Sequence, residues 1–142
     1  MIWFKKYTLA EINGFSRDTM LSHLGIEYTT IEDNALTATM PVDHRTKQPA
    51  GILHGGASVA LAESVASVAS YLTLDPQKFY AVGLEINANH IKSKRQGLVY
   101  GKATPVHLGS STQVWNIDIT DEAGRLICKS RITMLILEKK GK

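Results

Sequence analysis

Cysteine is almost absent from this chain, because Cys128 is the only one among 142 residues. A single thiol cannot form an intramolecular disulfide, so a reducing cytoplasm is the expected compartment. An excess of one charge is also lacking: 16 Lys and Arg against 13 Asp and Glu leave a formal net charge of +3. An excess this small and scattered argues against nucleic acid as a partner.

Long apolar runs are missing as well. The apolar residues Met1 to Phe4 are followed at once by Lys5 and Lys6. We therefore expect no signal peptide, no membrane-spanning segment and no membrane partner.

Three catalytic signatures are also absent. No HExxH pattern occurs, and no histidine has a metal-ligand spacing with Glu63, so no metal site is expected. Gly55 and Gly56 lack the Gly-Lys-Ser/Thr that completes a phosphate-binding loop. No serine lies in a Gly-x-Ser-x-Gly turn, which excludes the usual serine hydrolase.

The sequence does contain an apolar helix of small residues, predicted over Ala57–Leu72. Gly55 and Gly56 free the backbone before it, and Ser58 is expected to cap its first turn. Backbone N–H groups at such a helix start can polarise a carbonyl oxygen. The alternative is that the two glycines merely allow a tight loop.

Glu63 is the only formal charge between Lys47 and Asp75. A carboxylate on an otherwise apolar helix is costly to bury unless it is paired or used in chemistry. We therefore expect a general base or nucleophile in a dry cleft, with Ser67 on the same helix face within hydrogen-bond reach. The alternative is a solvated helix face.

Alternating apolar and polar residues predict strands around this helix. Thr8 and Glu11 have capping-box spacing, which predicts a short helix over Leu9–Gly14, and a second helical segment is expected near Asp18–His23. Strands are predicted over Ile26–Ile31, Leu36–Val42, Phe79–Ile91, Leu98–His107, Thr112–Thr120 and Arg125–Leu137. In the third strand Val82, Leu84, Ile86 and Ala88 are expected on one face. The prediction is one α+β domain over residues 1–142, a curved antiparallel sheet wrapped around the long helix.

Several motifs resemble the PaaI-type acyl-CoA thioesterases, which have the hotdog fold. The similar segments cover essentially the whole chain and include Met40-Pro41-Val42-Asp43, Gln48-Pro49, Leu53-His54-Gly55-Gly56-Ala57-Ser58, Leu61-Ala62-Glu63 and Gly83-Leu84-Glu85-Ile86-Asn87-Ala88-Asn89-His90. Within the family the chain looks most like bacterial 1,4-dihydroxy-2-naphthoyl-CoA hydrolases of menaquinone synthesis and their enterobactin-pathway relatives. The resemblance implies hydrolysis of an aromatic acyl-CoA, of the dihydroxynaphthoyl or hydroxybenzoyl type.

The resemblance also implies the site. It assigns catalysis to Glu63, with Gln48, His54, Gly55 and Ser67 around the thioester. Coenzyme A belongs to the substrate, and no cofactor is expected. The candidate substrate and coenzyme A contacts are Val82, His90, Lys92, Ser93, Arg95, Gly109, Ser110 and Ser111. One departure is Ala50, where relatives often have an aromatic residue; the smaller side chain is expected to widen the acyl pocket.

The spacing of Gly55 and Glu63 predicts a shared site. Eight residues of helix separate them by roughly 12 Å, so both cannot reach one thioester carbon within a single chain. Two antiparallel helices would bring Glu63 of one chain to Gly55 of the other, so a homodimer is required, and the family implies a tetramer.

Two other functions fit the same fold. A hydratase or dehydratase would rely on a histidine, here His54, which as a lone histidine could equally be a structural hydrogen-bonding residue. A non-catalytic acyl-CoA-binding protein would have no need of Glu63. Lys92, Lys94 and Arg95 suit the phosphates of coenzyme A, although a charged turn is commonly just solvated.

Overall fold

The computed structural model describes residues 1–141 as three helices and six strands. Every predicted element is present, with bounds that differ by at most two residues. No helix in this part of the chain is long and apolar enough to cross a membrane. In chain order the elements are α1 (Leu9–Gly14), α2 (Met20–His23), β1 (Glu27–Ile31), β2 (Leu36–Pro41), α3 (Gly55–Leu72), β3 (Phe79–His90), β4 (Leu98–Leu108), β5 (Thr112–Thr120) and β6 (Leu126–Glu138).

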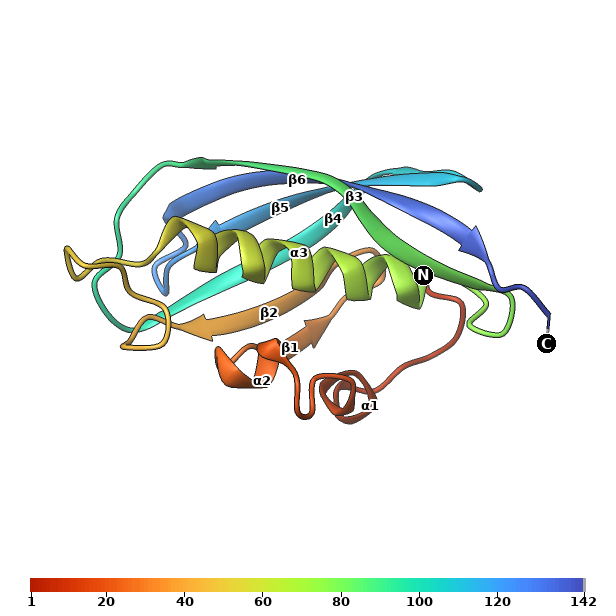
Figure 1. Cartoon of the computed structure of the whole chain (residues 1–142), viewed down its shortest axis with the longest axis horizontal. Helices are drawn as coiled ribbons and strands as arrows, with labels where there is room; N and C mark the ends of the chain where they lie inside the picture. The colour runs from red at the N-terminus through yellow and green to blue at the C-terminus, as the bar shows by residue number, and fades with distance from the viewer. Residues whose placement is uncertain (142) are drawn as a thin grey trace.

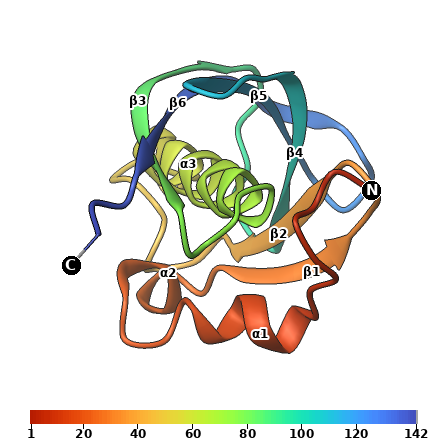
Figure 2. The same cartoon turned by 90° about the vertical axis from the view of Figure 1, so that its right-hand side faces the viewer.

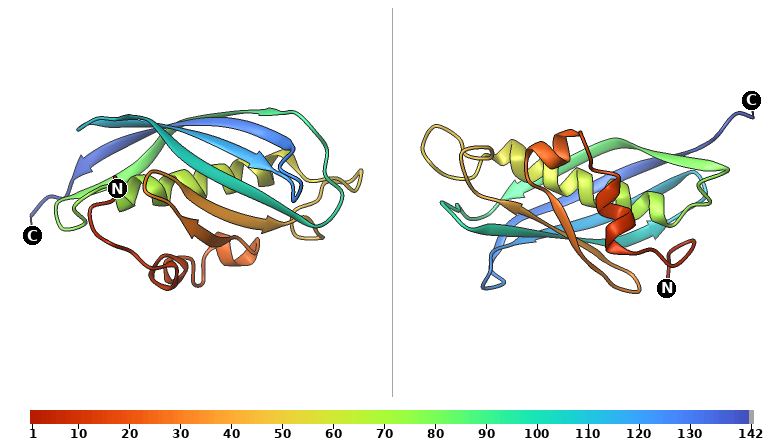
Figure 3. Two further views of the ribbon diagram at one scale, coloured as in Figure 1. Left: turned by 180° about the vertical axis from the view of Figure 1, so that it is seen from behind. Right: turned by 90° about the horizontal axis from the view of Figure 1, so that it is seen from below.

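The strands form one antiparallel sheet in the order β1-β2-β4-β5-β6-β3. The sheet curves around α3, as the view along the helix shows (Figure 2). The helices α1 and α2 lie below β1 and β2 (Figures 1 and 3). This arrangement confirms the predicted α+β hotdog fold, a curved sheet around one long helix.

The helix α3 fits the concave side because its inner positions are apolar and mostly small. Ala62 and Ala66 are fully buried, and Trp115 of β5 is buried within the same core. On β4, a Cβ added to Gly101 would lie 3.0 Å from Cγ of Leu61. Helix and sheet are therefore in close contact.

The edge strand β3 contains a bulge that the sequence pattern does not reveal. Its pairing with β6 shifts by one residue between Gly83 and Glu85, which leaves Leu84 as an extra residue. Val82 and Leu84 are 41% and 62% exposed, whereas Ile86 packs against the core. The prediction that these three side chains share a face is wrong, because the bulge reverses the alternation.

The only cysteine lies near the start of β6. Cys128 is fully buried and pairs with His90 of β3. Burial raises the pKa of its thiol above the usual value, because the thiolate would lose its solvation.

Candidate active site

His54 fixes the start of α3 by capping the helix with its imidazole. The imidazole Nδ1 accepts a hydrogen bond from the Gly56 N–H at 2.8 Å, and the backbone N–H of His54 donates to the Thr46 carbonyl at 2.8 Å. The prediction that Ser58 is the cap is wrong, because Ser58 lies inside the first turn. With the Gly56 N–H occupied, the Gly55 N–H is the one of the two without an acceptor among residues 1–141.

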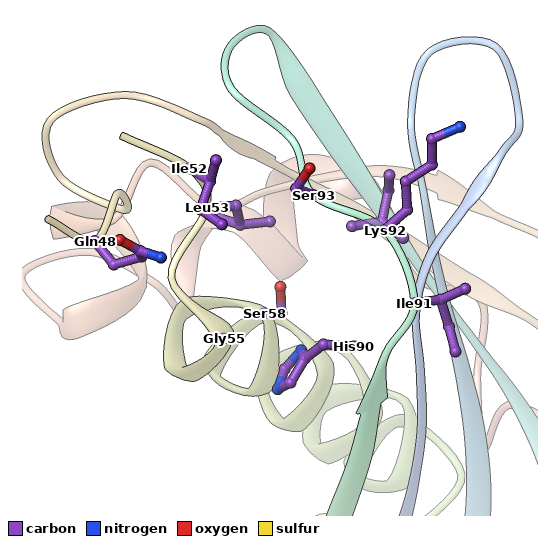
Figure 4. Close-up of a pocket in the computed structure, with 10 residues that line it drawn as sticks. Gln48, Ile52, Leu53, Gly55, Ser58, His90, Ile91, Lys92 and Ser93 are labelled. Atoms are coloured by element: carbon purple, nitrogen blue, oxygen red, sulfur yellow. The ribbon is translucent and has the colours of Figure 1, made fainter. Parts of the chain in front are cut away.

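A cavity of about 300 Å³ opens beside this helix start. It brings together five of the predicted site residues: Gln48, Gly55, His90, Lys92 and Ser93. The remaining lining residues are Ile52, Leu53, Ser58, Ile91 and Ile127 (Figure 4). Apolar walls with a few convergent polar groups are typical of a small-molecule site.

Gln48 is held in a tight loop at one side of the cavity. Its side-chain Oε1 accepts a hydrogen bond from the Ala50 N–H, and its carbonyl accepts one from the Gly51 N–H at 2.9 Å. Gly51 has a φ of +76°, a conformation that glycine adopts without strain. Because Oε1 is occupied within the loop, Nε2 points toward the cavity as a fixed donor (Figure 4).

His90, at the end of β3, lies directly against the helix start. A Cβ added to Gly55 would lie 2.8 Å from the His90 Nε2. Glycine at position 55 therefore allows the imidazole and the free N–H to border the same cavity. The predicted coenzyme A contact at His90 thus lies beside the predicted carbonyl-polarising group.

Glu63 lies outside this cavity, two turns further along α3. Its side chain is half-buried and faces β3, where a Cβ on Gly83 would lie 2.8 Å from Oε1. Within residues 1–141 the carboxylate has no hydrogen-bond or ion-pair partner. Ser67 does not bond to this carboxylate; the Ser67 hydroxyl instead faces the sulfur of Met134 at 4.0 Å. Glu63 is therefore half-buried beside Gly83 of β3.

The predicted cations around the cavity have different surroundings. Lys94 pairs with Glu122 and, together with the Leu98 N–H, lowers the pKa of that carboxyl to about 2. The Arg95 Nη1 donates to the Ala50 carbonyl at 3.5 Å, on the Gln48 loop. Lys92 has no acidic partner among the described residues, and its ammonium extends outward from the cavity (Figure 4). It is therefore the cation best placed for an anionic ligand.

The other predicted contacts lie elsewhere in the chain. His90 pairs with Cys128 near the start of β6, whereas the Ile136 N–H near its end donates to the Ser111 carbonyl at 2.9 Å. From Cys128 to Ile136 the strand rises roughly 26 Å. The turn Gly109–Ser111, which contains Ser110, is thus at the opposite end of the sheet from the cavity, and Val82 is exposed on β3.

Comparison with known proteins identifies the family. The model of the thioesterase superfamily matches residues 50–128, more than half of the chain. This chain belongs to the thioesterase superfamily. The thioesterase is 56% identical to the 1,4-dihydroxy-2-naphthoyl-CoA hydrolase of Escherichia coli over 137 residues, which cover 96% of this chain and 100% of the relative.

Two further relatives agree with this assignment. The proofreading thioesterase EntH of Cronobacter turicensis is 50% identical, covering 96% of this thioesterase and 99% of EntH. The crystal structure of a thioesterase mutant from Pseudomonas aeruginosa has a TM-score of 0.96 and 43% identity, covering 98% of this chain and 100% of that one. The predicted enzyme class is confirmed: the chain is a thioester hydrolase. No cluster of His, Cys, Asp or Glu within residues 1–141 could hold a metal ion.

The structure adds two residues to the predicted site of the thioesterase. Ser58 is 2% exposed, and its hydroxyl has no hydrogen-bond partner among the described residues and points into the cavity (Figure 4). Gly83 of β3 lies directly beside the carboxylate of Glu63 on α3. A signal for Gly83 was available, because an isolated glycine in a strand pattern suggests a bulge. Nothing in the sequence indicated that Ser58 lines a cavity, since a serine this close to the start of a helix is equally expected to cap it.

We expect His54→Ala to destabilise the fold by about 1 kcal/mol, because the Gly56 N–H loses its acceptor. His54→Asn should retain nearly all of the stability, since asparagine is a good N-cap residue without an imidazole. Urea denaturation of the wild type and both variants measures this. Equal free energies of unfolding for the alanine and asparagine variants would contradict the capping role.

Proposed function

We propose that this thioesterase hydrolyses an aromatic acyl-CoA, with 1,4-dihydroxy-2-naphthoyl-CoA as the first substrate to test and a hydroxybenzoyl-CoA as the second. The E. coli relative with that named activity matches along essentially its whole length. The observation that carries the chemistry is that α3 has two polar groups without a partner: the backbone N–H of Gly55 and the half-buried carboxylate of Glu63. Water is the second substrate, coenzyme A is a product, and no cofactor takes part.

In this proposal the Gly55 N–H polarises the thioester carbonyl at the positive end of the α3 dipole. Glu63 acts at the carbonyl carbon, either by taking a proton from water or by direct attack. Both routes break the C–S bond and release the acid and the protonated thiol of coenzyme A. Label that appears in Glu63 after a single turnover in H₂¹⁸O identifies direct attack, because water that opens the resulting anhydride at the Glu63 carbonyl leaves its oxygen on that side chain.

The reacting groups belong to two chains in this proposal. Within one chain Gly55 and Glu63 are roughly 12 Å apart along α3, beyond the reach of a single carbonyl group. The 12-residue strand β3 is an edge strand of the sheet, and its Val82 and Leu84 side chains are exposed. A second copy related by a two-fold axis at this edge places the two α3 helices antiparallel, with Glu63 of one near Gly55 of the other.

The same axis accounts for the split set of coenzyme A contacts. It brings the Gly109–Ser111 end of one sheet to the end of the second copy that carries His90, Lys92 and Ser93. The acyl chain then enters past the cavity of one copy while the nucleotide lies toward the turn of the other. Two such dimers form the tetramer that the family resemblance implies.

The rival functions receive no support from the site geometry. His54 uses Nδ1 to cap α3, so a hydratase would have to work with the Nε2 of a ring already fixed at the helix start. A binding protein without catalysis would have no role for an unpaired carboxylate beside β3.

We expect aromatic acyl-CoAs to be hydrolysed with a higher kcat/KM than palmitoyl-CoA. A thiol-release assay over dihydroxynaphthoyl-, hydroxybenzoyl-, benzoyl- and fatty acyl-CoAs measures this. Ala50→Phe should narrow the range of accepted acyl groups, because a ring would fill space beside Gln48. A palmitoyl-CoA kcat/KM equal to or above that of every aryl-CoA would overturn the substrate proposal while leaving thioester hydrolysis intact.

A further inference from the structure

Gly83 occupies a position on β3 where a side chain would meet the carboxylate of Glu63. The bulge between Gly83 and Glu85 turns Leu84 outward and directs Gly83 and Ile86 toward α3. A Cβ on Gly83 would lie 2.8 Å from the Glu63 Oε1 and 3.5 Å from its Cδ, and the first distance is shorter than real Cβ contacts. The carboxylate thus lies in the space that glycine leaves empty.

The backbone does not require glycine at this position. The positive-φ glycines are Gly25, Gly51, Gly97 and Gly124, and Gly83 is not among them. Alanine could therefore adopt the same strand conformation, and replacing glycine in a strand interior normally favours the folded state. The steric contact with Glu63 is what alanine at position 83 would change.

No polar contact fixes the carboxylate within the described chain. Glu63 has neither a hydrogen bond nor an ion pair there, so its position depends on packing between α3 and β3. After these two Glu63 atoms, the nearest atom to a Cβ on Gly83 is Cδ1 of Ile132 at 3.7 Å, an ordinary van der Waals distance. A methyl group at position 83 would therefore displace the end of the Glu63 side chain without disturbing the core.

We infer that Gly83 is a positioning residue for thioester hydrolysis, and that the β3 bulge places its empty side-chain position where the Glu63 carboxylate must lie to reach the thioester. This inference rests on the proposed role of Glu63. Gly83 itself touches no reacting atom; it acts by letting the carboxylate lie against the edge strand, where the second copy would bring Gly55.

The test compares Gly83→Ala with Gly101→Ala, a matched control on β4. Both glycines face α3, but a Cβ on Gly101 would meet the branched and buried Leu61 at 3.0 Å instead of Glu63. Gly83→Ala should lower kcat on the order of 10²-fold, with a small change in KM and an equal or higher melting temperature, because the reacting group is misplaced and the fold is not. Gly101→Ala should lower the melting temperature and leave kcat per folded enzyme unchanged.

A second comparison uses Glu63→Gln as the background, and a crystal structure of Gly83→Ala reads the position of the carboxylate directly. With the carboxylate removed, Gly83→Ala should cost no further activity, and the crystal structure should show Glu63 moved away from β3. An unchanged kcat in Gly83→Ala, an equal fall in both backgrounds, or a carboxylate still in place would overturn the inference. Wild-type turnover in Glu63→Gln alone would instead refute the proposed catalytic role, and the crystal structure would still decide whether Gly83 positions the side chain.

Discussion

Replacing Glu63 with glutamine should lower thioester turnover by about 10²–10⁴-fold, the range that a positioned base or nucleophile contributes. Glutamine keeps the shape of the side chain and removes its basicity. The fold should be retained, because burying a neutral amide costs less than burying a charge. Steady-state thiol release, with circular dichroism to verify folding, measures both effects.

Glu85→Gln is the matched control for this variant. Glu85 lies on the opposite, exposed face of β3, where it accepts a hydrogen bond from the Asn87 amide at 3.1 Å. The same chemical change at that position should leave kcat within about twofold of the wild type, as expected for surface substitutions. If Glu63→Gln turned over at the wild-type rate, as Glu85→Gln is expected to, Glu63 would not be the catalytic base or nucleophile.

Two variants that are each nearly inactive should restore activity when their chains are mixed. Gly55→Pro removes the free N–H at the first position of α3, where proline is well tolerated in a helix. A heterodimer of Gly55→Pro and Glu63→Gln chains contains one site with both an intact Glu63 and an intact Gly55. Random pairing of dimers should therefore recover about a quarter of wild-type activity.

A further variant separates the lost donor from the added bulk. Gly55→Ala keeps the N–H but adds the Cβ that would meet His90, so the difference between the alanine and proline variants reports the donor itself. Unfolding and refolding the two inactive chains together, with mass spectrometry to verify mixed oligomers, provides the sample. Mixed oligomers without recovered activity would exclude the shared site.

The order of the elements was predictable because burial imposes periods that can be read from the chain. The capping box of Thr8 and Glu11 is present, with the Glu11 N–H donating to the threonine hydroxyl at 3.2 Å. The sheet face on which Val82 and Leu84 lie was not predictable, because one extra residue in a strand reverses which side chains point inward and leaves no mark on the composition.

The site was predicted less completely for a similar reason. The family resemblance assigned Gly109–Ser111 and His90 to one ligand, whereas within a chain the length of β6 separates them, and no sequence pattern reveals that separation. The cap at His54 was missed because histidine is not among the usual capping residues. Which glycine N–H remains free depends on that single ring nitrogen, and no spacing rule reveals it.

Because Cys128 is buried in the folded enzyme, its reactivity toward thiol reagents reports unfolding. The thiolate is the form of cysteine that attacks thiol reagents, and burial both disfavours it at Cys128 and shields the sulfur. In the native enzyme such reagents therefore detect the coenzyme A released by turnover and not the protein. Once the sheet opens, the same side chain becomes the only reactive thiol of the polypeptide. The fraction of chains labelled at increasing temperature or denaturant concentration then measures the fraction unfolded, without a fluorescent tag or an engineered residue.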